Sequence, residues 1–194
     1  MLRSEERSLI ERAARGDQGA AASLIRHHQQ SLYAYMMRMS GRPDVAEDIV
    51  QEAFVRVLTN LDRFDFRYRF STWLFTIARR LYLNAVAKHR PAYDTDMVGA
   101  WKGADAAPEA PVEADEQQVV WRDALQAALL SLPADQREVV ILFHQHDWPI
   151  ALIAQHLDMP EGTVKSHLHR GRKRLRTYIE TTPTPDDSFV EHNA

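Results

Sequence analysis

Residues 148–176, WPIALIAQHLDMPEGTVKSHLHRGRKRLR, constrain the fold of this chain more than any other stretch. Apolar residues recur at helical spacing in the first half, at Ile150, Ile153, Ala154 and Leu157. A turn follows. Pro160 is well suited to the first position of a second helix, because the N–H that proline lacks has no hydrogen-bond partner within the helix there. Two helices joined by such a turn form a helix-turn-helix, whose second helix fits the major groove of DNA.

The predicted second helix has a basic outer face and an apolar inner face. Residues 161–180 hold six basic residues against two glutamates, while Val164, Leu168 and Leu175 face inward. A basic run alone is equally typical of a solvated helix, but the helix and turn before it favour DNA binding. Lysine and arginine would contact phosphates, and short polar side chains near the helix start would reach base edges.

The net charge of −3 hides two basic segments on either side of an acidic one. Residues 62–90 carry seven basic against two acidic residues, and residues 92–123 carry eight acidic against two basic. Residues 91–115 are rich in Ala, Gly, Pro and acidic residues without an apolar period, which predicts a flexible linker. Residues 181–194 similarly predict a disordered tail.

The other segments predict helices and no strand. Helical spacing of apolar residues covers roughly residues 4–16, 18–39, 44–61, 71–89, 116–130 and 133–143. The expected fold class is all-α, with small helical domains at residues 1–90 and 116–180. Nothing in the sequence defines the orientation of one domain relative to the other.

Aromatic and basic residues alternate in residues 62–71, DRFDFRYRFS, which we call the aromatic–basic segment. Interleaved rings and cations suit single-stranded nucleic acid, because bases stack on rings while arginines follow the phosphates. Phe64 and Phe70 are equally compatible with a place in the core. The helix that follows has a polar, basic side formed by Arg79, Arg80, Asn84 and Lys88.

Several function classes find no support in the sequence. The chain has no cysteine, no apolar run of the roughly 20 residues that span a membrane, and no signal peptide. His-x-His pairs on a helix point about 200° apart, which makes a poor chelate. No nucleophile–base pair, phosphate loop or metal spacing is found. We therefore expect a cytoplasmic protein without a cofactor, a metal, catalytic activity or membrane insertion.

An alternative is an enzyme or metal sensor that uses five histidines: His144, His146, His156, His167 and His169. Stoichiometric zinc in the purified protein would support that alternative.

Two passages together resemble the extracytoplasmic-function group of bacterial RNA polymerase sigma factors, within the sigma-70 superfamily. DVAEDIVQEAFVRVLTNLDRF, followed by FSTWLFTIARRLYLNAVAKHR, is similar to sigma region 2. LPADQREVVILFHQHDWPIALIAQHLDMPEGTVKSHLHRGRKRLR is similar to sigma region 4. The GTVKSxLxR helix alone also occurs in two-component regulators, whereas the two blocks in this order across an acidic linker are specific.

The resemblance implies a factor that binds core RNA polymerase, recognises the −35 and −10 promoter elements and promotes transcription initiation. The helix over residues 44–61 would dock on the β′ clamp helices through Asp48, Gln51, Glu52 and Arg56; from the residues alone it is equally an ordinary solvated face. The −10 element would be opened and held by Phe70, Trp73, Arg80, Asn84 and Lys88. The −35 duplex would be bound by Thr163, Lys165, Ser166, His169, Arg170, Arg172 and Lys173.

The resemblance also implies further partners, and the sequence differs from the family at one position of interest. The apolar face of region 4 would rest on the β flap of the polymerase, and an anti-sigma protein would hold the factor inactive. Family members commonly carry Asn where this chain has Arg80, in the IARR tetrad, so the captured −10 base is left undefined. Neither the target promoters nor the activating signal can be read from the sequence.

The alternative is a non-sigma regulator that binds DNA as a dimer through the same helix-turn-helix. Such a regulator predicts a receiver or ligand-binding domain ahead of that motif. Residues 1–90 show neither strands nor the βα alternation of a receiver domain.

Overall fold

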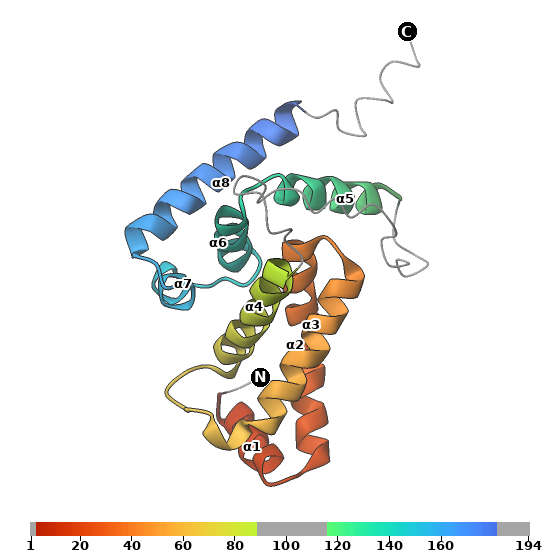
Figure 1. Ribbon diagram of the computed structural model, residues 1–194, viewed down its shortest axis with the longest axis vertical. Helices are drawn as coiled ribbons and strands as arrows, with labels where there is room; N and C mark the ends of the chain where they lie inside the picture. Colours follow the sequence, from red (N-terminus) through yellow and green to blue (C-terminus); the bar gives the residue numbers. More distant parts are fainter. Residues whose placement is uncertain (1–2, 89–115, 182–194) are drawn as a thin grey trace. The chain divides into compact units, whose positions relative to one another are not determined.

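The computed structural model describes residues 3–88 and 116–181 (Figure 1). Within these ranges the chain forms α-helices and one short 3-10 helix, without a strand, which confirms the all-α prediction. The helices belong to two compact units, each with its own core. The predicted linker and tail lie outside the described residues, apart from Thr181 at the end of the last helix.

The first unit contains most of α2 (Gln18–Ser40) and of α3 (Pro43–Thr59), while residues 38–43 belong to the second unit. It is completed by α1 (Arg3–Ala14), the 3-10 helix η1 (Leu61–Arg63) and α4 (Phe70–Lys88). Gly16, with φ of +92°, lies in the left-handed region just after α1. Asp17 then accepts a hydrogen bond from Ala20 N at 3.0 Å, so it caps the start of α2. That hydrogen bond, together with Arg12, lowers the pKa of Asp17.

The core of the first unit follows the apolar spacing of the sequence. Leu24, Leu32 and Met36 of α2 are completely buried, as are Ala53 and Val57 of α3. Each fully buried side chain of leucine size stabilises the fold by about 1.5–3 kcal/mol before entropy is counted. The Tyr35 and Phe75 rings stack with their centroids 4.9 Å apart, and both side chains are buried.

The second unit contains α5 (Glu116–Leu130), α6 (Ala134–His144), α7 (Ile150–Leu157) and α8 (Glu161–Thr181). Helices α7 and α8 form the predicted helix-turn-helix (Figure 1). Asp158 takes a left-handed conformation with φ of 55°, and Met159 N donates to Ala154 O at 2.9 Å, which ends α7. Pro160 precedes α8 and accepts hydrogen bonds from Thr163 N and Val164 N, so its expected place as the first helical residue was wrong by one position.

Helix α6 is buried on nearly all sides, including its polar residues. Arg137 donates from Nη2 to Leu130 O at 2.9 Å and to Leu132 O at 3.0 Å, which satisfies carbonyls at the end of α5. His156 Nε2 of α7 lies 3.9 Å from Glu138 Oε1, with both side chains buried. Burial lowers the pKa of His146 to about 4, so this imidazole is neutral at pH 7.

No helix in the described part of the chain is both long enough and apolar enough to cross a membrane.

Candidate nucleic-acid interface

Helix α8 presents one continuous polar and basic face to solvent. Lys165, Ser166, His169, Arg170 and Lys173 are all exposed. At about 100° per residue, these positions fall within an arc of about 140°. The arc holds three cations, one hydroxyl and one imidazole. Such a face combines phosphate contacts with groups that can reach base edges in the major groove.

The buried side of α8 fixes the direction of this face. Val164 and Leu168 are buried against the other helices of the second unit. Gly171 is buried where α8 lies close to α6, because an added Cβ would lie 2.7 Å from Val140 Cγ2. The sequence gives no sign of this requirement, since a glycine in a basic helix reads only as a poor helix former.

Two of the predicted −35 residues lie at the edge of the exposed face. Thr163 is half-buried. Arg172 donates from Nε to His144 Nε2 at 2.9 Å, and its guanidinium lies 5.1 Å from the centroid of the Phe143 ring. Arg172 is therefore engaged with the end of α6, and it would have to leave His144 to contact a phosphate.

A second exposed polar face lies on α4 in the first unit. Arg80, Asn84 and Lys88 are four residues apart and exposed, so they line one side of the helix. Trp73 is half-buried one turn from the start of α4, at a position compatible with the same side. Phe70 is completely buried and has no surface to offer a base in this conformation.

The aromatic–basic segment contributes to the core as well as to the surface. Phe64 and Phe70 are both buried, with ring centroids 5.9 Å apart, and Trp73 packs 5.2 Å from Phe64. The core interpretation of these two phenylalanines is therefore the correct one. Tyr68 is 48% exposed, and Phe66 is intermediate. The surface available for stacking a base is the Tyr68 ring, with part of Phe66 and Trp73.

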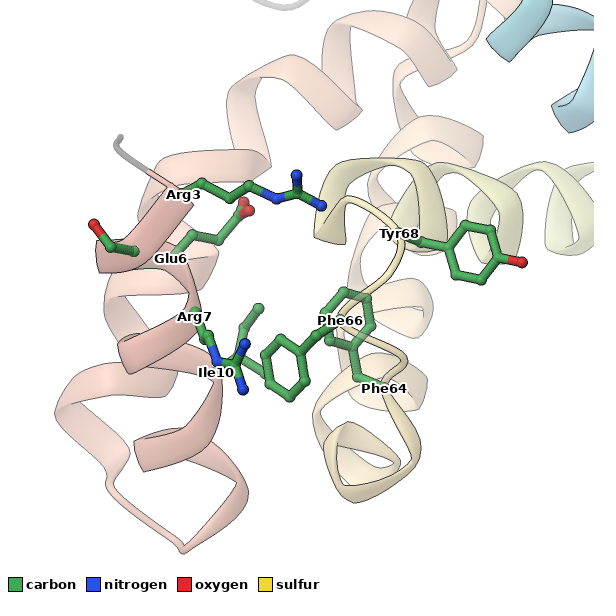
Figure 2. Close-up of a pocket in the computed structure, with 8 residues that line it drawn as sticks. Arg3, Glu6, Arg7, Ile10, Phe64, Phe66 and Tyr68 are labelled. Atoms are coloured by element: carbon green, nitrogen blue, oxygen red, sulfur yellow. The ribbon is translucent and has the colours of Figure 1, made fainter.

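A cavity of about 310 Å³ separates the aromatic–basic segment from α1. Figure 2 shows Arg3 and Arg7 of α1 on one side and Phe66 on the other, with the Tyr68 ring pointing away from α1. The Arg7 guanidinium lies 4.7 Å from the centroid of the Phe66 ring, at cation–π distance. The loop bends because Asp65 Oδ1 accepts from Arg67 N at 2.9 Å.

Glu6, which lines the same cavity, is held by a buried partner. His28 Nε2 of α2 lies 3.3 Å from Glu6 Oε1, and the His28 ring packs 5.1 Å from Phe70. This contact with His28 lowers the pKa of Glu6, so the carboxylate is ionised at neutral pH. His28 is itself buried. Sequence spacing within α1 had not identified Arg3, Glu6 or Arg7, because their partners come from residues distant in the chain.

A third surface runs along α3. Asp48, Gln51, Glu52 and Arg56 are exposed within an arc of about 140°, and Arg56 Nε pairs with Glu52 Oε1 at 2.7 Å. Val55 lies in the middle of this arc and is 60% exposed. Val55 was not among the residues predicted for this surface, although it is the most exposed of the large hydrophobic side chains in the described part of the chain.

Among the residues that the structure describes, no three His, Cys, Asp or Glu side chains are grouped so that they could hold a metal ion.

Comparison with known proteins gives matches over both units. Residues 24–91 match the family model for sigma-70 region 2, and residues 122–175 match that for sigma-70 region 4. The chain is 35% identical over 176 residues to the ECF RNA polymerase sigma factor SigW of Bacillus subtilis, covering 88% of this chain and 94% of that protein. It is 30% identical to the ECF RNA polymerase sigma-E factor of Escherichia coli, covering 89% and 93%.

Solved structures show the same architecture. The sigma factor RpoE of Bartonella quintana, crystallised with the anti-sigma factor NepR, matches with a TM-score of 0.67 and 25% identity, covering 84% of this chain and 98% of that one. The structure of CnrH with the cytosolic domain of CnrY matches in fold with a TM-score of 0.69 at 21% identity, covering 92% and 99%.

Proposed function

Because this chain belongs to the extracytoplasmic-function sigma factors of the sigma-70 family, we propose that its two units divide the work of initiation between three exposed faces. The protein is a sigma factor that directs promoter-specific transcription initiation by RNA polymerase. The family matches over both units leave the dimeric regulator without support. Each face is assigned to one step: binding of the −35 element, capture of the −10 element, or docking on core polymerase.

The outer face of α8 is proposed to bind the −35 element as duplex DNA. The observation that carries this is the shared arc of Lys165, Ser166, His169, Arg170 and Lys173 on the second helix of a helix-turn-helix. Ser166 donates its hydroxyl to Gly162 O at 2.9 Å, so its oxygen stays available as an acceptor for a base amine. Thr163 and Arg172 are assigned to flanking phosphates because they lie at the edge of the arc.

The −10 element is proposed to be held in single-stranded form between α4 and the aromatic–basic segment. Arg80, Asn84 and Lys88 would follow the backbone, while Tyr68 and Trp73 would offer stacking surfaces. Phe70 would act from beneath, packing against Phe64 and Trp73 to support that surface. The cavity beside α1 adds Arg3 and Arg7 as cations that could meet the same strand.

Replacing Tyr68 by alanine is expected to reduce promoter opening about tenfold or more. Stacking of one base on an aromatic ring contributes about 1–3 kcal/mol, and the exposed ring contributes little to the core. Opening can be followed by the fluorescence of 2-aminopurine placed in the −10 element, using polymerase carrying each variant. Tyr68→Phe keeps the ring and should open the promoter nearly as well as the wild type; equal opening by Tyr68→Ala would contradict this role.

The exposed face of α3 is proposed to dock on the β′ clamp helices of core polymerase through Asp48, Gln51, Glu52 and Arg56, with Val55 at its centre. Val55→Asp is expected to weaken core binding at least tenfold, because a carboxylate would be desolvated at the middle of the contact. Affinity can be measured by titrating core polymerase into the fluorescently labelled factor. Val55→Ala and the exposed Gln30→Asp serve as controls that should change affinity less than threefold. Unchanged affinity for Val55→Asp would remove this face from the proposal.

The remaining partners of the factor are part of the same proposal. The domains are placed at residues 1–90 and 116–180, with 91–115 as the connection. The apolar side of the second unit is proposed to meet the β flap. An anti-sigma protein is proposed as the inhibitor, as in the complex of RpoE with NepR. The factor would act in the cytoplasm, where RNA polymerase works, through binding and not through catalysis.

A further inference from the structure

An open groove lies between α6 and the C-terminal half of α8, with a volume of about 410 Å³. Its floor is apolar and consists of Val140, Leu175 and Ile179, while Arg172, Arg176 and Glu180 line its rim. Ile179 is 46% exposed, although it is large and aliphatic. Removing such a side chain from water is favourable, so the groove favours an apolar occupant.

The rim of the groove is positive near its centre. Arg176 is exposed and makes no ion pair within the described part of the chain. Arg172 contacts His144, whose pKa is lowered by burial and by Arg172 itself, so the imidazole adds no charge at pH 7. Among the described residues that line the groove, Glu180 is the one acidic group, and it lies near the end of α8. An occupant with carboxylates on both sides of an apolar pair would complement this pattern.

The chain itself carries such a segment directly after α8. Residues 182–194 read TPTPDDSFVEHNA, in which Phe189 and Val190 are flanked by Asp186, Asp187 and Glu191 without any lysine or arginine. These residues belong to the tail that the sequence predicts to be disordered, and they lie outside the described residues. Pro183 and Pro185 come just after the last residue of α8, and proline disfavours the continuation of a helix.

The reach of this segment matches the length of the groove. From Ile179 back to Arg172 is about 10 Å along the helix axis, at 1.5 Å per residue. The eight residues from Thr181 to Phe189 can span at most about 26–29 Å when extended. The chain can therefore turn back and place Phe189 against Leu175 or Ile179. A tethered segment also has an effective concentration in the millimolar range, which favours it over a free competitor.

We propose that residues 186–191 dock in the α6–α8 groove of the same molecule, with Phe189 and Val190 on the apolar floor and the carboxylates against Arg176 and Arg172. Docking would cover Ile179 and neutralise cations on the helix that also carries the proposed −35 face. The docking does not depend on that proposed function, whereas its effect on DNA binding rests on it. The expected consequence is a weakened affinity of the free factor for duplex DNA.

Hydrogen exchange of the full-length chain tests the docking directly. With Phe189→Ser, amides of residues 172–181 are expected to exchange at least threefold faster than in the wild type, because the groove loses its cover. Thr184→Ser, a change in the same segment away from the apolar pair, should leave exchange as in the wild type. Equal exchange in the wild type and Phe189→Ser would overturn the proposal. Protection that rises with protein concentration would also overturn it, since a second copy would then be the occupant.

A peptide experiment supplies a second readout. A labelled peptide of residues 182–194 is expected to bind the full-length Phe189→Ser chain and to bind the full-length wild-type chain at least tenfold more weakly, because the groove of the wild type is already filled. Binding should weaken in high salt and with Phe189→Ser in the peptide. Equal binding to both chains, or to neither, would contradict the docking. If docking holds but Lys165→Ala with Arg170→Ala leaves −35 affinity unchanged, the proposed −35 face fails and the docking stands.

Discussion

Replacing Lys165 and Arg170 together by alanine is expected to lower the affinity of the factor for its −35 duplex about 100-fold or more. Each side chain that reaches a base edge or a phosphate contributes about 1–3 kcal/mol, and every 1.4 kcal/mol is a factor of ten. Both residues are exposed and lie on one face of α8, so their removal should leave the fold intact. Duplex binding by polymerase carrying the factor, measured over a range of salt concentrations, checks this.

The salt dependence separates the two kinds of contact. Loss of one phosphate contact should reduce the slope of log affinity against log salt by about 1, whereas loss of a base contact relaxes the preferred sequence. The matched control is Arg15→Ala with Arg26→Ala, which removes two exposed cations from the first unit. If the control lowers −35 affinity as much as the α8 variant does, the loss comes from the reduced positive charge of the protein as a whole. The α8 face would then not be the surface that recognises the −35 element.

Replacing Gly171 by alanine is expected to destabilise the second unit by about 1–3 kcal/mol. The new methyl group would lie 2.7 Å from Val140 Cγ2 and 3.5 Å from Gln136 O, both on the buried helix α6. Because α6 and α8 cannot separate without opening the core, overpacking should also turn the −35 face and reduce transcription. Chemical denaturation of a protein that keeps the buried Trp148 as its single tryptophan, followed by fluorescence, reports on this unit.

Two further variants make the result specific. Gly162→Ala adds the same methyl group to the first turn of α8, where nothing lies within 4 Å, and should leave stability unchanged or raise it by up to about 1 kcal/mol. Val140→Ala combined with Gly171→Ala removes the clashing methyl and should recover part of the loss. Equal stability of the Gly171→Ala and Gly162→Ala proteins would show that α6 and α8 do not approach as closely as described.

Local periodicity was enough to predict the helices and the helix-turn-helix. Val164 and Leu168 are spaced so that only one side of α8 can be buried, and that spacing also determined which residues face solvent. The −35 candidates on the central arc are therefore exposed as expected. Arg172 differs from the other −35 candidates because its orientation depends on His144 and Phe143, which lie 28 and 29 residues earlier in the chain.

The first unit shows where local spacing is insufficient. In the aromatic–basic segment, alternation cannot tell which rings enter the core, because that depends on α2 and α4 around the loop. Phe70 is buried since it packs between His28 and Phe64, whereas Tyr68, two residues earlier, is exposed. The pairing of Glu6 with His28 likewise joins helices that sequence spacing treats separately.

The most direct test of sigma-factor function is run-off transcription with bacterial core polymerase on a genomic promoter library, with and without this protein. We expect new, discrete start sites that appear only with the protein and share motifs at −35 and −10. These starts should be lost with Lys165→Ala and Arg170→Ala, and retained with Arg15→Ala and Arg26→Ala. Absence of new starts, together with sequence-specific duplex binding by the protein without polymerase, would contradict a sigma-factor role and favour a regulator that acts alone.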